Sequence, residues 1–189
     1  MKTINDYIVV ENFLSKDTCN TIIENIDKKT YWEKHNWYNP KENYRYSKSD
    51  KELDVLCIDY ELSKIIYPIV NKAIKNYVKR FDIGGENTTN FINYFTPVRF
   101  NKYITGTKMR KHFDFIQSIF DGNYKGIPIL SIVGSLNDNY EGGEFVFNDN
   151  HIIKLNAGDF LMFPSTFMYA HEVREITKGT RYSFVSWGF

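Results

Sequence analysis

The sequence predicts a mainly β fold, either a sandwich or a jelly roll, with helices packed against one of its sheets. From Phe91 onward, short runs of alternating or continuous apolar residues are separated by clusters of Gly, Asn, Asp and Pro, which is typical of strands joined by turns. Aromatic residues make up 17% of the chain, mostly Tyr and Phe, and these residues favour pleated sheets. Many short strands at regular spacing are typical of sandwiches and jelly rolls.

The N-terminal part of the chain predicts a short strand and two helices. The strand covers residues 7–11, and Ser15 then offers an N-cap to a helix whose apolar residues recur at helical spacing. A second helix is expected from Leu62 to Tyr77. Pro68 lies within it, so this helix either kinks there or starts late.

The rest of the chain predicts a loop and a series of strands. Residues 30–50 are polar and aromatic without sustained periodicity, and we expect a long loop there that covers a substrate. The expected strands are residues 91–104, 111–115, 128–136, 143–147, 151–155, 159–163, 168–174 and 180–187. With 189 residues, 42% of them hydrophobic, the chain is the size of one domain with one core. We therefore expect a single domain over residues 1–189, with helical support and a variable loop in 1–90 and the jelly-roll core in 91–189.

Composition argues against several classes of protein. The 24 Lys and Arg against 23 Asp and Glu give a formal charge of +1, which provides no global field for nucleic acid or anionic membranes. The apolar run near the N-terminus is too brief for a signal peptide or a membrane span, so we expect a cytoplasmic protein without a membrane partner. Cys19 and Cys57 are too few and too far apart for a disulfide framework, so we expect reduced thiols. The oligomeric state stays open.

Three residues are candidates for metal ligands. His112 and Asp114 flank Phe113 in a predicted strand, where alternate residues share one face, so the imidazole and the carboxylate point the same way. His171 lies in a later predicted strand. The ordinary alternatives are a surface hydrogen bond for the first pair and a buried core histidine for His171. Two histidines and one carboxylate leave open positions on Fe(II), which oxygen activation requires and a closed zinc site does not permit.

A possible anion clamp lies in the last predicted strand. Arg181 opens this strand and, with a period of two, shares one face with Ser183 and Trp187. Arginine holds a carboxylate through two parallel charge-assisted hydrogen bonds, so this face could anchor a dicarboxylate, with Ser183 adding a bond. The alternative is an exposed ion pair with Glu172 or Glu175 that has no function.

Several motifs follow one another along the C-terminal half of the chain. They are Tyr103-Ile104-Thr105-Gly106 with His112-Phe113-Asp114, the turn from Leu136 to Phe145, Ala157-Gly158-Asp159, Phe163-Pro164-Ser165, His171-Glu172-Val173 and Gly179-Thr180-Arg181. In order and spacing, this half resembles the prolyl 4-hydroxylase-like branch of the Fe(II)/2-oxoglutarate-dependent dioxygenases, in particular its bacterial and phage hydroxylases. The N-terminal 90 residues match only in the pattern of strand, helix, variable loop and helix.

The resemblance implies a fold, a set of cofactors and a reaction. The fold would be a double-stranded β-helix core with the N-terminal helices packed on one sheet. Fe(II) would be bound by His112, Asp114 and His171. The co-substrate 2-oxoglutarate would be held by Arg181, Tyr103 and Ser183. The implied reaction is a hydroxylation that uses O2 and produces succinate and CO2, and ascorbate could support it.

The resemblance also suggests where a substrate binds. Trp187 matches an aromatic residue that borders the substrate in relatives, and Trp37 and Tyr38 are further candidates for substrate contact. We expect a prolyl or other amino-acid residue of a peptide or protein, or a small molecule. Peptidyl-proline stays open, because collagen-type prolyl hydroxylases have Lys at the position of Arg181. The strand beginning at Pro128 also lacks a basic residue that those enzymes use toward the peptide.

Two other functions remain as alternatives. One is a nucleic-acid oxygenase or demethylase, with a basic group and a set of stacking aromatics formed by Lys108, Arg110 and Lys111 and by Trp32, Trp37 and Tyr38. Such demethylases carry a second Arg where Trp187 stands here, and the balanced charge does not favour nucleic acid. The other is a non-catalytic jelly-roll binding module, which would not consume 2-oxoglutarate. His35 and His151 receive no role, because both lie among polar neighbours typical of surface loops or turns.

Overall fold

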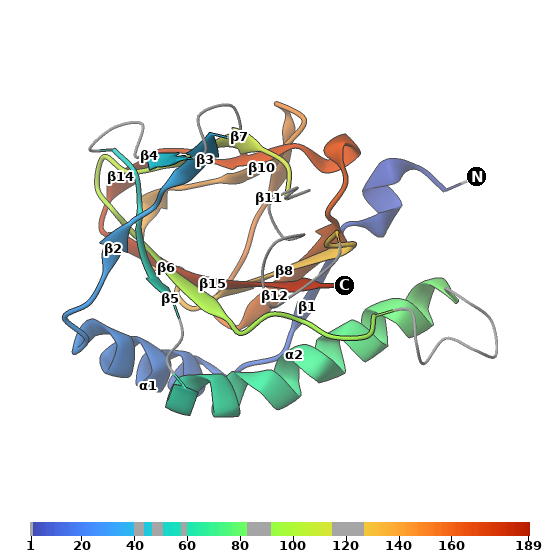
Figure 1. The fold of residues 1–189 in the computed structure, drawn as a ribbon, viewed down its shortest axis with the longest axis horizontal. Helices are drawn as coiled ribbons and strands as arrows, with labels where there is room; N and C mark the ends of the chain where they lie inside the picture. The colour runs from blue at the N-terminus through green and yellow to red at the C-terminus, as the bar shows by residue number, and fades with distance from the viewer. Residues whose placement is uncertain (1, 40–43, 47–50, 58–59, 83–91, 115–126) are drawn as a thin grey trace.

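The computed structural model describes residues 2–39, 44–46, 51–57, 60–82, 92–114 and 127–189. Its two main sheets face each other, and two helices cover the outer side of the larger sheet (Figure 1). The larger sheet has the order β1 (Val9–Asn12), β12 (Asp159–Pro164), β8 (Leu130–Ser135), β15 (Thr180–Gly188), β6 (Arg99–Ile104), β5 (Asp54–Cys57) and β2 (Glu33–Lys34). The smaller sheet has the order β11 (His151–Ile153), β10 (Phe145–Phe147), β13 (His171–Val173) and β7 (Met109–His112).

The described strands of both sheets pair in antiparallel fashion. Two short ribbons complete the β structure: β9 (Glu141–Gly142) pairs with β14 (Ile176–Lys178), and β3 (Trp37–Asn39) pairs with β4 (Tyr44–Tyr46). This arrangement confirms the predicted mainly β, jelly-roll fold with N-terminal helices on one sheet.

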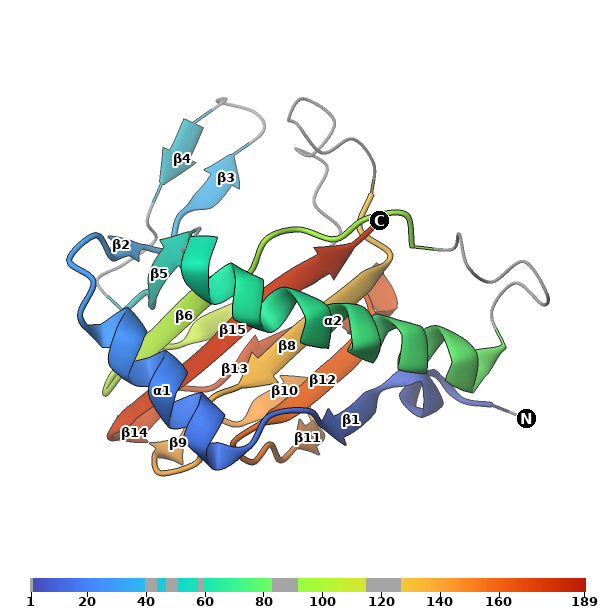
Figure 2. The same cartoon turned by 90° about the horizontal axis from the view of Figure 1, so that it is seen from below.

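The two helices form as their sequences predict. Ser15 caps α1 (Lys16–Asp27), since its side-chain oxygen accepts a hydrogen bond from the N–H of Thr18 at 3.1 Å. The helix α2 (Tyr60–Phe81) contains Pro68 in its interior, so a late start at this proline is wrong. Figure 2 shows both helices lying across the outer face of the larger sheet. Buried residues of α1 and α2 join the outer side chains of that sheet in one apolar cluster.

The strand β15 separates two hydrophobic cores. Because side chains alternate along a strand, Tyr182 and Phe184 point to the cluster under the helices, whereas Val185 points between the two sheets. Arg181 and Ser183 share the inward face with Val185, and both are buried. The inner face of β15 therefore carries polar groups into the space between the sheets.

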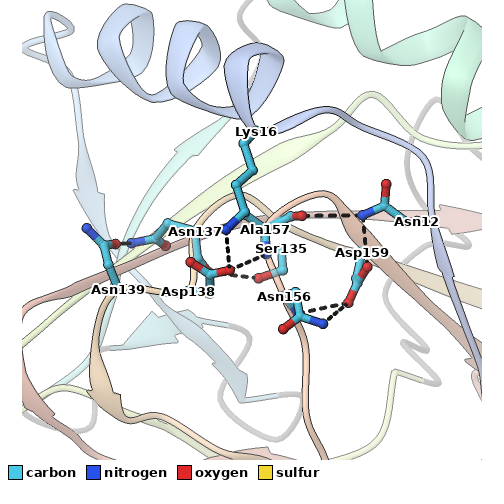
Figure 3. Close-up of polar contacts among 9 residues, drawn as sticks. All are labelled: Asn12, Lys16, Ser135, Asn137, Asp138, Asn139, Asn156, Ala157 and Asp159. Atoms are coloured by element: carbon cyan, nitrogen blue, oxygen red, sulfur yellow. Dashed lines mark hydrogen bonds and ion pairs between the residues drawn. The ribbon is translucent and has the colours of Figure 1, made fainter.

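A polar network fixes the turns that flank β8 and β12, as Figure 3 shows. Asp138 accepts a hydrogen bond from the N–H of Ala157 at 3.2 Å, and its carboxylate lies 3.5 Å from Nζ of Lys16 in α1. On the other side, Asp159 accepts a hydrogen bond from Nδ2 of Asn12 at 2.9 Å. The network thus ties α1 and β1 to the two turns that the sequence motifs identified.

The structure corrects several predicted elements. The loop expected over residues 30–50 contains the strands β2, β3 and β4 in its described part, so a loop without regular structure is wrong there. The strand β5 was not predicted. The strand expected at 91–104 starts only at Arg99, and the one expected at 168–174 begins as a 3-10 helix, Phe167–Tyr169, before β13. No helix in the described ranges combines the length and apolar character needed to cross a membrane.

Candidate metal centre

The smaller sheet brings the three predicted metal ligands together. His171 at the start of β13 pairs directly with His112 at the end of β7, so their side chains lie next to each other. Nε2 of His112 lies 3.4 Å from Oδ1 of Asp114, and Nε2 of His171 lies 3.9 Å from the same oxygen. One ligand atom from each residue lies within 4.8 Å of the others, so the three groups could hold one metal ion.

Backbone carbonyls orient both imidazoles. Nδ1 of His112 lies 2.7 Å from the carbonyl oxygen of Arg110, and Nδ1 of His171 lies 3.0 Å from that of Tyr169. A carbonyl can only accept, so each Nδ1 carries the hydrogen and each Nε2 presents a lone pair. Burial, together with the neighbouring His112, lowers the pKa of His171 to about 4, although Asp114 opposes the shift. His171 is therefore a neutral ligand at neutral pH.

The carboxylate of Asp114 is kept ionised in a buried position. Ser131 on β8 donates a hydrogen bond to its Oδ2 at 2.7 Å and lies 2.8 Å from the hydroxyl of Ser165. Burial alone would raise the pKa of Asp114, but His171, His112 and Ser131 outweigh it and hold the pKa well below its usual range. The group is thus an anionic ligand, with one oxygen bonded to Ser131 and the other toward the histidines.

The donor set fits a ferrous ion with open coordination positions. Two neutral imidazoles and one carboxylate are the protein ligands typical of non-haem Fe(II) oxygenases. The ring of His171 packs against three phenylalanines whose centroids lie 4.9–5.7 Å away: Phe145, Phe147 and Phe163. This apolar wall restricts water on one side of the centre and leaves the other side to the pocket.

The candidate anion clamp is buried in the same pocket. Arg181 is 1% exposed and donates from Nη1 to Oγ of Ser183 at 3.0 Å. Its guanidinium lies 4.9 Å from the ring centroid of Tyr103, its neighbour across β6 and β15. The Nε hydrogen of Arg181 has no acceptor, and none of the ion pairs between described residues includes it. Glu172 pairs with Arg174 instead. The alternative of an exposed Arg181 ion pair is therefore wrong.

A buried cation without a counter-ion fits a bound carboxylate. Burial raises the pKa of Tyr103, although Arg181 and Arg99 oppose this shift, so its hydroxyl stays protonated and can donate. Ser183 adds a hydroxyl on the same inward face. Together the three side chains offer the donors that the distal carboxylate of 2-oxoglutarate needs.

The metal ligands and the clamp line one and the same pocket. Trp187, the candidate for substrate contact, also lines it, together with Arg99 and Asn101, to which the sequence analysis gave no role. Their position could have been found, since Arg99 and Asn101 share the period-two face of Tyr103 on β6.

The ribbon of β3 and β4 contributes one aromatic side chain to the site. The ring of Trp37 meets the ring of His112 edge-on, with centroids 5.6 Å apart. The backbone of Tyr38 lies in β3, but its side chain is outside the described part of the structure. His35 was expected on the surface, but it is 8% exposed and packs edge-on against Trp37 at 5.0 Å. The sequence did not reveal this burial, because the other contacts of His35 lie further along the chain: its N–H donates to the carbonyl oxygen of Leu53, and its Nδ1 lies 3.9 Å from Oε2 of Glu52.

Glu52 and two of the basic residues near the site, Arg110 and Lys111, have partners within the chain. Glu52 is fully buried and accepts a hydrogen bond from Nε1 of Trp37 at 3.1 Å. Of the basic residues considered for nucleic acid, Arg110 lies 3.5 Å from Glu52, and Lys111 lies 2.7 Å from Asp149. These two charges are partly neutralised, which weakens the basic surface that the nucleic-acid alternative requires.

Comparisons with known proteins agree with this geometry. Residues 98–189 match the model of a family described as the 2OG-Fe(II) oxygenase superfamily. A PKHD-type hydroxylase of Methylobacterium nodulans is 35% identical over 99 residues, which cover 48% of this chain and 42% of the relative. One of Aliarcobacter butzleri is 39% identical over 95 residues, 47% of this chain and 41% of the relative. The match thus spans less than half the length of these curated relatives.

Solved structures resemble the chain over nearly its whole length. A prolyl 4-hydroxylase of Pseudomonas putida has a TM-score of 0.69 at 17% identity and covers 98% of this chain and 95% of its own. A prolyl hydroxylase of Trichoplax adhaerens, solved with a peptide fragment of the hypoxia inducible factor oxygen degradation domain, has a TM-score of 0.68 at 18% identity. It covers 96% of this chain and 83% of its own. At such identities the likeness concerns the fold.

Proposed function

We propose, from the match of residues 98–189 to the 2OG-Fe(II) oxygenase superfamily, that the protein is an Fe(II)- and 2-oxoglutarate-dependent hydroxylase. Its reaction would use O2 and release succinate and CO2. Its substrate would be a prolyl or other amino-acid residue of a peptide or protein.

One observation carries this proposal: a possible metal triad and a buried guanidinium without a counter-ion line the same pocket. A structural zinc site would need a fourth protein ligand, and no fourth His, Cys, Asp or Glu joins the triad among the described residues. A binding module without redox chemistry would not account for three metal-ligand side chains next to Arg181, which forms no ion pair with the described residues. The hydroxylase accounts for both features.

Each residue has a separate role in the proposed reaction. His112, Asp114 and His171 would hold the iron, and Arg181, with Tyr103, would orient 2-oxoglutarate through its distal carboxylate. When bound, iron and 2-oxoglutarate would activate O2, of which one oxygen atom enters succinate as 2-oxoglutarate loses CO2 and the other enters the new hydroxyl group of the substrate. The protein side chains orient the reactants and exclude water; none has to act as a nucleophile.

The substrate class is proposed from relatives and from the pocket wall. PKHD-type and prolyl hydroxylases are the named relatives and neighbours, and one neighbour was solved with a peptide. Trp187 lines the pocket, and Trp37 packs on His112, so we propose both as substrate contacts, together with Tyr38 on the same strand as Trp37.

The test is conversion of 2-oxoglutarate to succinate by the Fe(II)-loaded protein in the presence of O2. Proline peptides, free amino acids and oligonucleotides are added in turn, with and without ascorbate. We expect substrate-independent turnover, and stimulation by a peptide or amino acid. Complete absence of succinate in the wild-type protein, with the metal shown to be bound, would contradict the proposal. Stimulation only by oligonucleotides, weakening with salt, would favour the nucleic-acid alternative instead.

Two variants separate the roles of the metal ligands and the clamp. His112→Ala should abolish turnover, because it removes one of the three metal ligands. It should leave the fold intact, because His112 lines the pocket and is not part of the apolar core. His151→Ala, on β11, is the matched control and should keep wild-type turnover.

Arg181→Ala should chiefly raise the concentration of 2-oxoglutarate that is required. We expect an increase of about tenfold or more, which corresponds to the free energy of a charge-assisted hydrogen bond. Wild-type kinetics in either site variant would refute its assigned role.

A further inference from the structure

A second arginine lies in the same pocket without a counter-ion. Arg99, at the start of β6, lines the pocket that holds the metal ligands and Arg181. Its Nε donates to Oδ1 of Asn101 at 3.2 Å, and its guanidinium lies 5.2 Å from the ring centroid of Trp187. None of the ion pairs between described residues includes it. A guanidinium has five N–H donors, and among the described residues one hydrogen bond from Arg99 is seen.

Trp187 adds a second donor without an acceptor at this place. Its indole Nε1 is buried and has no hydrogen-bond partner. Buried donors are normally satisfied, so an orphaned group in a pocket points to an absent ligand. Burial lowers the pKa of Arg99, although Tyr103, Cys57 and Asp114 oppose the shift, and the residue remains partly exposed. The described residues thus provide positive charge and several donors here, with Oδ1 of Asn101 as the acceptor for one of them.

The backbones of Arg99 and Arg181 lie at different ends of the wall formed by β6 and β15. In the pairing of β6 with β15, Arg181 lies opposite Tyr103, whereas Arg99 lies opposite Val185. The two arginines are thus separated by four residues along the shared wall, or about 13 Å at about 3.3 Å per residue. Because Arg181 and Tyr103 form the candidate co-substrate clamp at one end, the other end is free for the molecule that becomes hydroxylated.

We propose that Arg99, assisted by Trp187, binds a carboxylate of the substrate, and that this protein therefore selects substrates with a carboxylate close to the carbon that is hydroxylated. This inference rests on the proposed function, whose substrate class it narrows. The carboxylate could belong to a free amino acid, to the C-terminal residue of a peptide or to an acidic side chain beside the target residue. Arginine recognises all three through the same paired hydrogen bonds.

The experiment compares probes that differ only in this carboxylate. One pair is N-acetyl-proline and N-acetyl-proline amide, and a second is the capped peptides Gly-Pro-Asp-Gly and Gly-Pro-Asn-Gly. A third pair, cytidine 5′-phosphate and cytidine, tests whether the site prefers a phosphate to a carboxylate. Dissociation constants are measured by calorimetry without O2, both with and without Fe(II) and 2-oxoglutarate, so that binding is separated from turnover. For the wild-type protein we expect at least one carboxylate probe to bind about tenfold tighter or more than its amide.

The variants locate this preference at Arg99. Arg99→Gln should bind both members of each pair equally, and Arg99→Lys, which keeps the charge, should restore part of the preference. Arg80→Gln is the matched control, since Arg80 lies on α2 and pairs with Glu11 outside the pocket; it should behave as wild type.

Several results would overturn the assignment. These are equal binding of every carboxylate probe and its amide by the wild-type protein, a preference that survives in Arg99→Gln, or a stronger preference for the phosphate probe. Failure of the proposed function would look different. Succinate would then not form in any variant, while the binding comparison, which needs no turnover, would still decide the role of Arg99.

Discussion

At the scale of single residues, the candidate metal centre depends on groups that do not touch the metal. The hydroxyl of Ser131 donates to Asp114 at 2.7 Å and helps to keep this carboxylate ionised and oriented. Partners of this kind typically contribute about 10–100-fold to metal affinity. The bond crosses from β8 in the larger sheet to the ligand that follows β7, so it also fixes the distance between the two sheets at the site.

We therefore predict that Ser131→Ala weakens binding of Fe(II), or of Mn(II) as a redox-stable substitute, by about 10–100-fold. Calorimetric titration of the metal-free protein measures this. Ser186→Ala is the matched control, because Ser186 is equally buried but donates to the carbonyl oxygen of Thr96 instead. Unchanged metal affinity in Ser131→Ala, or an equal loss in both variants, would show that the Asp114 bond has no specific part in metal binding.

The sequence predicted those residues of the site whose partners follow from strand periodicity or motif spacing. His112 and Asp114 lie two residues apart on one face. His171 was the third candidate, and in the structure β13 brings it next to them. Arg99 was missed although it shares a face with Tyr103, because a lone arginine in a strand has no motif. Glu52 was missed for a different reason: its contacts, Trp37 and Arg110, are far away in sequence, and only the folded chain reveals them.

At the scale of elements, the ribbon of β3 and β4 is anchored beside the pocket through one buried carboxylate. Glu52 accepts from Trp37 and lies 3.5 Å from Nε of Arg110, whose carbonyl oxygen orients His112. Its Oε2 has no hydrogen-bond partner, and the nearest cation candidate, Nδ1 of His35, is 3.9 Å away. Burial, with Arg99 and His112 nearby, lowers the pKa of His35 to about 3, so this imidazole is neutral at pH 7.

Glu52→Ala should loosen the ribbon and destabilise the protein. The change removes the acceptor that holds Trp37 against His112, and removal of a buried acceptor costs about 1–3 kcal/mol. We expect faster amide exchange over Trp37–Asn39 and a lower free energy of unfolding. Glu141→Ala is the control, because Glu141 forms an exposed pair with Lys178, and its loss should change stability by less than about 0.5 kcal/mol. Equal protection of the ribbon in both variants would contradict the anchoring role.

A second link between elements predicts a pH dependence. Asp27, at the end of α1, accepts hydrogen bonds from Nζ of Lys102 at 2.7 Å and from the hydroxyl of Tyr182 at 2.7–2.8 Å. Burial alone would raise the pKa of Asp27, but these bonds outweigh it and lower the pKa. A folded-state pKa below the unfolded value of about 3.9 means that the link stabilises the fold above that pH and is lost as the pH falls through the lowered pKa.

Asp27→Asn should therefore be less stable than the wild-type protein at pH 7, and the difference should shrink as the pH falls below about 4. Urea unfolding at a series of pH values measures it. Asp17→Asn, in the first turn of the same helix, tests whether any acidic residue of α1 behaves in this way. A difference between Asp27→Asn and wild type that stays constant from pH 7 to pH 3 would argue against the carboxylate as the source of the link.

Elements were predictable where local signals agreed with burial. The helix α1 combined a cap with helical spacing, and its buried residues, Cys19, Ile22 and Ile26, follow that spacing. The strands β2, β3 and β4 are two or three residues long, which is too short to show a period. Their pairing is set by contacts such as that between Trp37 and Glu52 rather than by local preference.

At the scale of the whole molecule, the fold places the reactive groups between two sheets while the main apolar cluster lies elsewhere. Because side chains alternate along β15, those of Tyr182 and Phe184 pack toward the helices, whereas those of Arg181 and Ser183 point into the pocket. This separation explains how the fold can persist at 17% identity in a solved prolyl 4-hydroxylase, since only the period of the pattern must be kept. The sequence could therefore predict the architecture, whereas the occupant of the pocket depends on side chains such as Arg99.

The same separation predicts that the metal adds to stability without being required for folding. Most buried apolar residues belong to the cluster between the helices and the larger sheet, on the opposite face of β15 from the triad, so the metal-free protein should fold. A metal at about 100 times its dissociation constant stabilises by about 2.7 kcal/mol. For a chain of this size this raises the melting temperature by about 5–10 °C. Chelation should reverse the shift, and thermal melts with and without Mn(II) measure it.

His112→Ala and its control His151→Ala complete this test. Both metal-free variants should melt close to the metal-free wild-type protein, because neither side chain belongs to the apolar clusters. Only His151→Ala should gain stability on addition of Mn(II), since His112→Ala leaves two ligands where three are needed. A protein that unfolds completely on chelation would show that the metal is structural, and an equal gain in both variants would place the bound metal away from the triad.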